Sequence, residues 1–257
     1  MKLIHKVEDC VVYKGNDSTY LLKIPSSPEL LRAIKDAGTI KHIIKKSTNA
    51  TSTSETLKFK ATRVESLKQF IEKMHDKNMN GLIYTLVLKM LADVGTLLQY
   101  ALSEYGRAIP FFSLEDIIVI ENANTAATTT TEEPTFDFVF INGEKLLQIS
   151  RDRETKTNKC NNRVLRVDVP LQVNKQTSFL PLELAESELK HLPINVTATS
   201  WLYSLSSLCI YALLNYKFKN GEDDIERIGR PFLHTSLYFC LKRCMKTKPE
   251  KRVLLYV

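Results

Sequence analysis

The sequence has no pair of cysteines at CxxC spacing and no HExxH motif, two patterns typical of zinc sites. Its cysteines are odd in number, which argues against a disulfide framework. Cys240 and Cys244 lie one helical turn apart beside apolar residues, so we expect packed core thiols in a reducing compartment. The five cysteines are Cys10, Cys160, Cys209, Cys240 and Cys244.

Long apolar segments are also missing. The first ten residues contain no apolar h-region, and no segment reaches the roughly 20 apolar residues that a membrane span needs. We therefore expect no signal peptide, no membrane span and an intracellular location, cytoplasmic or nuclear. The 44% hydrophobic and 25% charged content is ordinary for a globular protein, and 257 residues suffice for a sizeable core.

Acidic residues are outnumbered by basic ones, which gives a net charge of +7. This excess favours acidic partners, whether nucleic acid, an anionic membrane or an acidic protein. Part of it lies in basic runs at residues 41–46, 151–166 and 242–252. Because no Gly/Arg-rich tract or aromatic-interleaved RNA motif accompanies them, we interpret these runs first as solvated faces and loops.

Hydrophobic periodicity predicts a mixture of helices and strands, and therefore an α+β fold. The helix over 201–214 is apolar nearly all round and must be buried. The dipeptide Asn142-Gly143 suits a type I′ turn and predicts a hairpin of 136–141 with 145–149. Other helices are expected over 28–37, 66–74, 82–103 and 235–245, other strands at 11–13, 19–24, 57–62 and 117–120, and a polar loop at 47–55.

Four phrases carry a resemblance to a known family. They are Ser113-Leu-Glu-Asp-Ile-Ile-Val119, Phe179-Leu-Pro-Leu-Glu-Leu184, Tyr203-Ser-Leu-Ser206 and Lys248-Pro-Glu-Lys-Arg252. Their order, with the Asn-Gly hairpin, resembles the protein kinase fold. Several details are similar to the degenerate kinase-like proteins of large DNA viruses. The resemblance implies a reduced N-lobe over 1–56 and a mainly helical C-lobe over 57–257, with a Thr-rich insert at 121–135.

The resemblance also implies a structural ion pair. In kinases, the glutamate that closes the activation segment pairs with an arginine near the C-terminus, and Glu183 and Arg252 stand in those places. A guanidinium can satisfy a buried carboxylate through two hydrogen bonds. The alternative is that both are exposed surface charges. Trp201 stands where kinases have an aspartate that anchors the catalytic loop, so we expect that loop to be held differently.

The catalytic positions implied by the resemblance carry degenerate residues. Phe111 replaces the catalytic aspartate, Ser113 the loop lysine and Asp116 the metal-binding asparagine. Asp116 is a candidate Mg²⁺ ligand because carboxylate oxygens suit a hard cation, and the alternative is a cap at the end of a strand. Lys23 is a candidate for the nucleotide-binding lysine, and the alternative is an exposed strand lysine. No GxGxxG loop is present to hold phosphates.

We therefore expect a catalytically impaired kinase-like domain, a pseudokinase, that binds a protein partner and needs no cofactor. One alternative is a divergent active serine/threonine kinase that uses ATP and Mg²⁺, with Asp137 or Glu115 converging on Asp116. Another is a nucleic-acid-binding protein with a steep salt dependence, although the basic run is better explained as a remnant of the activation segment. Its phosphate-binding residues would be Arg151, Arg153, Lys156, Lys159, Arg163 and Arg166.

Overall fold

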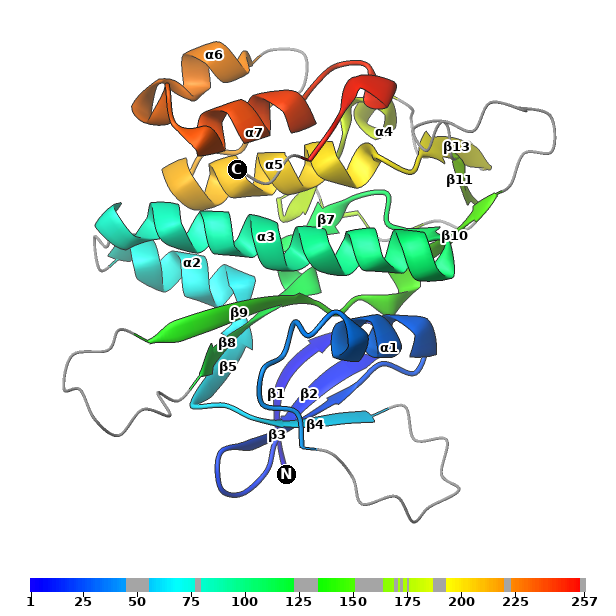
Figure 1. Cartoon of the computed structure of the whole chain (residues 1–257), viewed down its shortest axis with the longest axis vertical. Coiled ribbons are helices and arrows are strands. Elements are labelled where there is room, and N and C mark those ends of the chain that lie inside the picture. Colours follow the sequence, from blue (N-terminus) through cyan, green and yellow to red (C-terminus); the bar gives the residue numbers. More distant parts are fainter. Residues whose placement is uncertain are drawn as a thin grey trace.

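The computed structural model describes residues 1–44, 56–76, 80–122, 134–150, 164–168, 171, 173–174, 176–186, 193–219 and 223–254. The polar loop expected at 47–55 and most of the Thr-rich insert lie outside these residues. The fold is a mixture of helices and antiparallel sheets, as the periodicity predicts. Figure 1 shows the N-terminal sheet at one end of the molecule and the last helices at the other.

The N-terminal sheet has four antiparallel strands in the order β1-β2-β3-β4. The hairpin expected from residue 11 to 24 is confirmed as β2 and β3, with Val12 opposite Leu22. β4 pairs with β3 along its whole length, so the sheet extends past the predicted domain boundary at residue 56. The strands are β1 (Lys2–Val7), β2 (Cys10–Lys14), β3 (Thr19–Lys23) and β4 (Thr56–Lys60).

Helix α1 (Pro28–Asp36) covers this sheet (Figure 1). It begins where the sequence predicts, because the Ser27 hydroxyl accepts a hydrogen bond from the Leu30 amide at 3.3 Å and Pro28 fits the first turn. Leu30, Ala33 and Ile34 form its buried face. The connection between β3 and α1 is therefore short and fixed at both ends.

The rest of the chain is built around α3 (Asn80–Tyr105), which packs against β9, α5, α1 and α2. By length and composition alone, Leu82–Tyr105 could cross a membrane, whereas we expected no segment of that kind. Half of its most apolar window is buried inside the protein. The expected burial of α5 (Ser200–Leu214) is confirmed. The remaining helices are α2 (Leu67–Asp76), α4 (Leu182–Glu186), α6 (Ile225–Ile228) and α7 (Ser236–Cys244).

The remaining strands form three small antiparallel sheets. One contains β5 (Arg63–Ser66), β8 (Ile117–Asn122) and β9 (Thr135–Phe140). Another contains β6 (Arg107–Ala108), β10 (Leu147–Ser150), β11 (Val164–Val167) and β13 (Ile194–Thr197). The third pairs β7 (Phe112–Ser113) with β12 (Ser178–Phe179).

The predicted hairpin around Asn142-Gly143 is wrong. β9 pairs with β8, and β10 pairs with β6 and β11, so the two strands belong to different sheets. Asn142 has a φ of −78°, whereas a type I′ turn needs positive φ at both central residues. Gly143–Lys145 instead forms the 3₁₀ turn η2. The Asn142 side chain, held by a buried carboxylate, fixes this different path.

Candidate functional site

Four polar side chains converge in the interior where β7, β8 and β9 end or begin. Ser113 closes β7, and Asp116 ends the 3₁₀ turn η1 (Leu114–Asp116) before β8. Asn142 directly precedes η2, and Lys145 is the last residue of that turn. All four are buried, with 6%, 1%, 1% and 4% of their surface exposed in that order. Buried polar groups at such depth need partners, and here they find one another.

The Asp116 carboxylate is the centre of this cluster. Its Oδ2 accepts hydrogen bonds from the Ser113 amide and from Lys145 Nζ, both at 2.7 Å. Its Oδ1 accepts one from Asn142 Nδ2 at 2.8 Å. Lys145 Nζ also donates to Ser113 Oγ at 2.9 Å. The carboxylate is thus neutralised by an internal ammonium and has a donor at each oxygen.

Phe111 forms an apolar wall of the cluster. Its ring is fully buried, and Lys145 Nζ lies 4.3 Å from the ring centroid. A cation over an aromatic face is attracted by the ring quadrupole, most strongly when it is desolvated. The ammonium is therefore held by a carboxylate and a hydroxyl and also by the ring.

The β3–α1 connection covers the cluster from the N-terminal side. A Cβ at Gly143 would lie 2.5 Å from Ser26 Oγ and 2.8 Å from both Ile24 Cγ2 and Ser27 Cβ. Contacts this close leave room for a glycine alone. Asp9 holds the connection in place by accepting hydrogen bonds from the Ser26 amide at 2.6 Å and the Ser26 hydroxyl at 3.0 Å.

Two further contacts join the N-terminal sheet to the rest of the molecule. His5 Nε2 donates a hydrogen bond to the Glu115 carbonyl oxygen at 2.8 Å. Arg107 lies 3.4 Å from the Glu29 carboxylate of α1. Glu115 directly precedes Asp116, so the His5 contact links β1 to the turn that carries the cluster, and the Arg107–Glu29 pair links α1 to β6.

Three acidic residues lie near the contact between the β3–α1 connection and Gly143. The turn between β1 and β2 carries Glu8 and Asp9, and Glu144 follows Gly143. Burial raises the pKa of Glu144, and the charges of Glu8 and Asp9 raise it further. The three carboxylates are therefore close enough to repel one another and any other anion.

The structure places Lys23 and Asp137 away from the cluster. Lys23 is exposed at the end of β3, and Glu29, the first carboxylate of α1, is paired with Arg107. Asp137 lies opposite Ile120, four residues beyond Asp116, which is roughly 13 Å along a strand. It accepts a hydrogen bond from Asn122 at 2.8 Å. Asp137 and Asp116 therefore do not converge.

Asp137 belongs instead to a second polar group near α3. Lys89 Nζ lies 3.4 Å from Asp137 and 2.6 Å from Asp93. Burial raises the pKa of Asp93, and the charge of Asp137 adds to that effect. This group ties α3 to β9, since Asp93 also accepts from the Phe138 amide at 3.1 Å.

Glu183 and Arg252 lie in contact as a bidentate pair. Arg252 Nη1 and Nη2 donate to Glu183 at 2.6 and 2.8 Å, and the guanidinium is buried over the Tyr203 ring. Burial alone would raise the Glu183 pKa, but hydrogen bonds from Arg252 and Ser200 outweigh it and lower that pKa. The pair fixes the C-terminal segment to the start of α4.

Ser204 anchors the start of β7, a role that the sequence did not reveal. Its hydroxyl accepts a hydrogen bond from the Phe112 amide at 2.7 Å and donates to the Phe179 carbonyl oxygen. The neighbouring Trp201 is buried and apolar. One serine on α5 therefore holds both β7 and β12. It lies one helical turn after Trp201, the position at which kinases have the anchoring aspartate.

Lys145 and Asn142 were also missed as site residues. Lys145-Leu-Leu-Gln-Ile149 looks like an ordinary strand whose lysine faces water, and Asn-Gly looks like a turn. One signal could have found Asn142: a polar residue directly after the apolar strand 136–141, as Asp116 lies directly before the apolar strand 117–120.

Of the six basic residues named in the run at 151–166, the structure describes one. Arg166 lies on β11 and pairs with Asp168 at 2.6 Å, and both are exposed. Arg151, Arg153, Lys156, Lys159 and Arg163 lie outside the described residues. In the described part of the chain, no three His, Cys, Asp or Glu side chains are placed to hold a metal ion.

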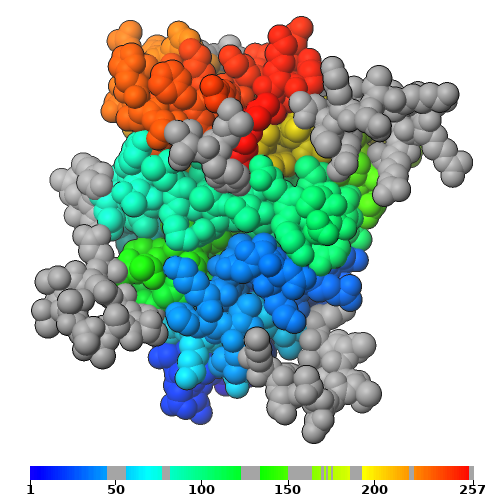
Figure 2. Space-filling view, viewed as in Figure 1, coloured from blue at the N-terminus to red at the C-terminus, as the bar shows by residue number. Residues whose placement is uncertain are grey.

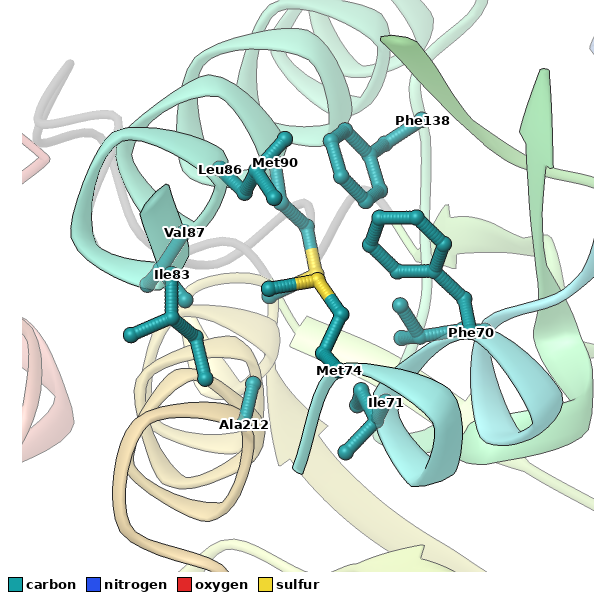
Figure 3. Close-up of a pocket in the computed structure, with 10 residues that line it drawn as sticks. Phe70, Ile71, Met74, Ile83, Leu86, Val87, Met90, Phe138 and Ala212 are labelled. Carbon is teal, nitrogen blue, oxygen red and sulfur yellow. The ribbon is translucent and has the colours of Figure 1, made fainter. Parts of the chain in front are cut away.

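An apolar pocket lies apart from the cluster, between α2, α3 and α5 (Figure 3). Met74 points into it from α2, and Met90, Phe70 and Phe138 surround it. Its free volume is about 10 Å³, and its lining has no hydrogen-bonding side chain. A space this small barely accommodates one water molecule, so the pocket is a gap in the core packing.

Comparisons with known proteins give one informative result. No family model matches the sequence, and no curated protein matches it. Among solved structures, the chain is similar to a rhoptry kinase from Toxoplasma gondii, with a TM-score of 0.57 and 14% sequence identity. The likeness covers 98% of this chain and 73% of that chain. At this identity it concerns the path of the chain and says nothing of its chemistry.

Proposed function

We propose that this chain, whose fold is that of the protein kinases, is a catalytically impaired kinase-like domain that acts by binding other proteins. The observation that carries the proposal is the buried Lys145–Asp116 pair against the Phe111 ring. By the order of the sequence, Phe111 and Asp116 stand where a kinase has its catalytic aspartate and its metal-binding asparagine.

Phosphoryl transfer needs side chains that this cluster does not offer. A kinase orients the acceptor hydroxyl with an aspartate and holds two Mg²⁺ ions with an asparagine and a second aspartate. The resemblance places Phe111 and Asp116 at the first two of these positions and offers no good counterpart of the second aspartate, and the side chain that contacts Asp116 Oδ1 is the amide of Asn142. A phenyl ring cannot accept a proton, and a neutral amide holds Mg²⁺ less well than a carboxylate. These replacements support a loss of transfer activity.

The cluster does not fit Mg²⁺. Both Asp116 oxygens already accept hydrogen bonds, and the Lys145 ammonium lies 2.7 Å from Oδ2. Asn142 Oδ1 is a buried oxygen without a hydrogen-bond partner, but one amide oxygen is far from the octahedral oxygen set that Mg²⁺ requires. A divalent cation placed beside the ammonium would also be repelled by it.

The closure around Gly143 argues against nucleotide binding. In a kinase, a glycine-rich loop covers the phosphates. Here the β1–β2 turn carries Glu8 and Asp9, and Asp9 is already bound to Ser26. A triphosphate beside this turn would be repelled by the Glu8 and Asp9 carboxylates.

A role in binding is supported by what the chain retains. The core helix α5, the Glu183–Arg252 pair and the Ser204 anchor keep the kinase frame while the catalytic positions have changed. Buried free thiols suit a reducing, intracellular compartment, and burial raises the pKa of Cys10 to about 12, which keeps that thiol unreactive.

Titration with a fluorescent ATP analogue in the presence of Mg²⁺ tests the proposal. We expect no saturable binding at micromolar nucleotide and no transfer of labelled phosphate to the protein itself. Asp116→Asn/Lys145→Met is the control, because it removes both charges of the cluster together and leaves neither one buried and unpaired. Autophosphorylation by the wild type that this double variant, shown to be folded by its thermal melting curve, no longer performs would overturn the proposal.

A further inference from the structure

The exposed apolar side chains are concentrated near the C-terminal end of the chain. Five large apolar residues of the described part are exposed, and two of them, Met1 and Leu3, lie at the N-terminus. The other three are Leu233, Phe239 and Val253, with 39%, 48% and 41% of their surface exposed. Single exposed apolar residues need no explanation, but three within 21 positions form a feature.

Phe239 is held rigidly on α7. Thr235 caps the helix by accepting a hydrogen bond from the Tyr238 amide at 3.2 Å, and Leu237, Cys240 and Leu241 are buried on its inner face. The Tyr238 ring lies 5.3 Å from the Phe239 ring. Phe239 therefore presents its exposed face without the entropic cost of ordering a mobile side chain.

Exposed basic residues follow Phe239 along the chain. Arg243 lies one turn after Phe239 on the exposed face of α7, and Lys246 and Lys248 follow the end of the helix, all exposed. Residues 228–254 contain seven basic side chains and a single acidic one, Glu250. Two of the basic residues are neutralised within the protein, Lys242 by Glu226 and Arg252 by Glu183.

We propose that this region, the α7 surface, binds an acidic segment of another protein that inserts an apolar side chain beside Phe239. The α7 surface is defined as Leu233, Phe239, Arg243, Lys246 and Lys248. It deepens the proposed function, on which it rests, by giving the chemistry of the partner. Its residues belong to the orange and red segments, which lie at the end of the molecule opposite the N-terminal sheet (Figures 1 and 2).

Charge complementarity selects an acidic partner, and the exposed apolar residues select a protein. Aromatic and apolar anchors ringed by polar contacts are the usual centre of a protein interface. Nucleic acids stack on aromatic rings, but Leu233 offers no flat face to a base. A membrane needs a broad apolar helix face, whereas Phe239 is flanked on α7 by Ser236 and Arg243.

The dimensions of the surface set the size of the occupant. Nine residues of α7 span about 14 Å, which matches roughly four or five residues of an extended peptide. A short linear segment is therefore sufficient. Longer partners would reach Val253, whose carbonyl oxygen accepts from the Cys244 thiol at the last turn of α7.

Selection from a random library of twelve-residue peptides tests this proposal without a known partner. The library is panned on the wild type, on Phe239→Ala/Arg243→Glu, and on Leu3→Ala/Lys23→Glu. The last variant makes the same chemical changes at exposed residues of the N-terminal sheet. All changed residues are exposed, and matching thermal melting curves establish that each variant is folded.

We expect peptides that combine Asp or Glu with one large apolar residue to be enriched on the wild type and on Leu3→Ala/Lys23→Glu. Fluorescence anisotropy of a selected peptide should show at least a tenfold weaker Kd for Phe239→Ala/Arg243→Glu. Enrichment that is equal on both variants, or that lacks acidic residues, would refute the assignment. The assignment would also be refuted if single-stranded DNA displaced the peptide and bound the Phe239→Ala variant as tightly as it binds the wild type.

The two proposals fail in different ways. If the wild type binds no nucleotide and no acidic peptide is enriched, the α7 surface is rejected and the catalytic impairment stands. If autophosphorylation is lost in Asp116→Asn/Lys145→Met while acidic peptides still require Phe239, the impairment is rejected and the α7 surface stands.

Discussion

Asp116 and Lys145 face each other at 2.7 Å with almost no access to water. Taking two such charges out of water costs several kcal/mol for each ion, and their attraction offsets that cost when every remaining donor and acceptor is also satisfied. Here Ser113, Asn142 and the Phe111 ring complete the set. The stability of the cluster therefore depends on keeping both charges or removing both.

Lys145→Met tests this dependence. We expect a loss of about 3–5 kcal/mol in the free energy of unfolding, because Asp116 would be left buried and uncompensated. The double variant Asp116→Asn/Lys145→Met should lose much less. Urea denaturation of the wild type, Lys145→Met, Asp116→Asn and the double variant gives the coupling energy between the two residues. If the losses of unfolding free energy in the two single variants simply added up in the double variant, the interpretation would be contradicted.

Glu183 makes the free energy of unfolding depend on pH in the acidic range. Its pKa in the folded protein lies below the usual value of about 4.5, so the unfolded chain binds more protons at low pH. The stabilisation is complete above that value and is lost as the pH falls through the folded pKa. We expect Glu183→Gln to cost roughly 3 kcal/mol at pH 7, and this difference from the wild type to shrink below about pH 4.5.

The matched control is Glu226→Gln in the exposed Lys242–Glu226 pair. Water screens a surface pair of this kind, so we expect Glu226→Gln to destabilise the protein much less than Glu183→Gln does. Urea midpoints measured from pH 7 to pH 3 compare the two variants. A Glu183→Gln deficit that is independent of pH would show that the carboxylate charge is not what matters.

At the scale of elements, α5 holds strands β7 and β12 in place through the hydrogen bonds of Ser204. Ser204→Ala removes the partner of the Phe112 amide and of the Phe179 carbonyl oxygen, both buried. We expect a loss of about 1–3 kcal/mol for each backbone group left unsatisfied. Urea denaturation measures the loss, and amide exchange should quicken at residues 112–113.

Ser206→Ala is the control for Ser204, since it lies on the same buried helix and deprives neither of those backbone groups of its partner. We expect a change below about 1 kcal/mol there. Equal losses for the two serines would indicate that α5 tolerates no small change of packing, and would remove the case for a specific anchor.

The β3–α1 connection depends on Gly143 in the same specific way. Gly143→Ala places a methyl group 2.5 Å from Ser26 Oγ, so the connection must shift, at a cost of about 1–3 kcal/mol. Gly15→Ala is the control, because its Cβ would meet Thr19 at an ordinary 3.4 Å. Hydrogen exchange of residues 24–30 should quicken in Gly143→Ala and stay unchanged in Gly15→Ala.

At the scale of the whole molecule, the N-terminal sheet and the helical part should unfold together. His5 and Glu29 of the N-terminal part bind the Glu115 carbonyl and Arg107, and Gly143 packs under Ser26. The single tryptophan, Trp201, reports on α5. We expect its fluorescence and the exchange of β2–β3 amides to change at the same denaturant concentration.

Gly143→Ala serves as the comparison for this prediction, since it strains the contact between the two parts. Its β2–β3 amides should open before Trp201 reports unfolding. If the β2–β3 amides of the wild type also exchange before the Trp201 fluorescence changes, the N-terminal sheet and the helical part unfold independently. The contacts between them would then be weaker than their number and distances indicate.

Patterns within a few residues of one another decided much of the fold. The cap at Ser27, the apolar helix around Trp201 and the strand before Asn142 could be predicted because caps and periodicity are local. The resemblance to kinases, drawn from the order of such elements, agrees with the likeness to a solved kinase structure. It also named Glu183 and Arg252, which are 69 positions apart and lie in contact.

Only the tertiary structure decided how the cluster is made. Lys145 reaches Asp116 across 29 positions, and no local pattern distinguishes this lysine from an exposed one such as Lys23. The conformation of Asn142 was set by a distant carboxylate against the preference of its own dipeptide. The sequence by itself determined which residues stand at the positions that the resemblance assigns to catalysis, whereas packing determined what surrounds them, because a buried charge is fixed by whichever partner the folded chain brings to it.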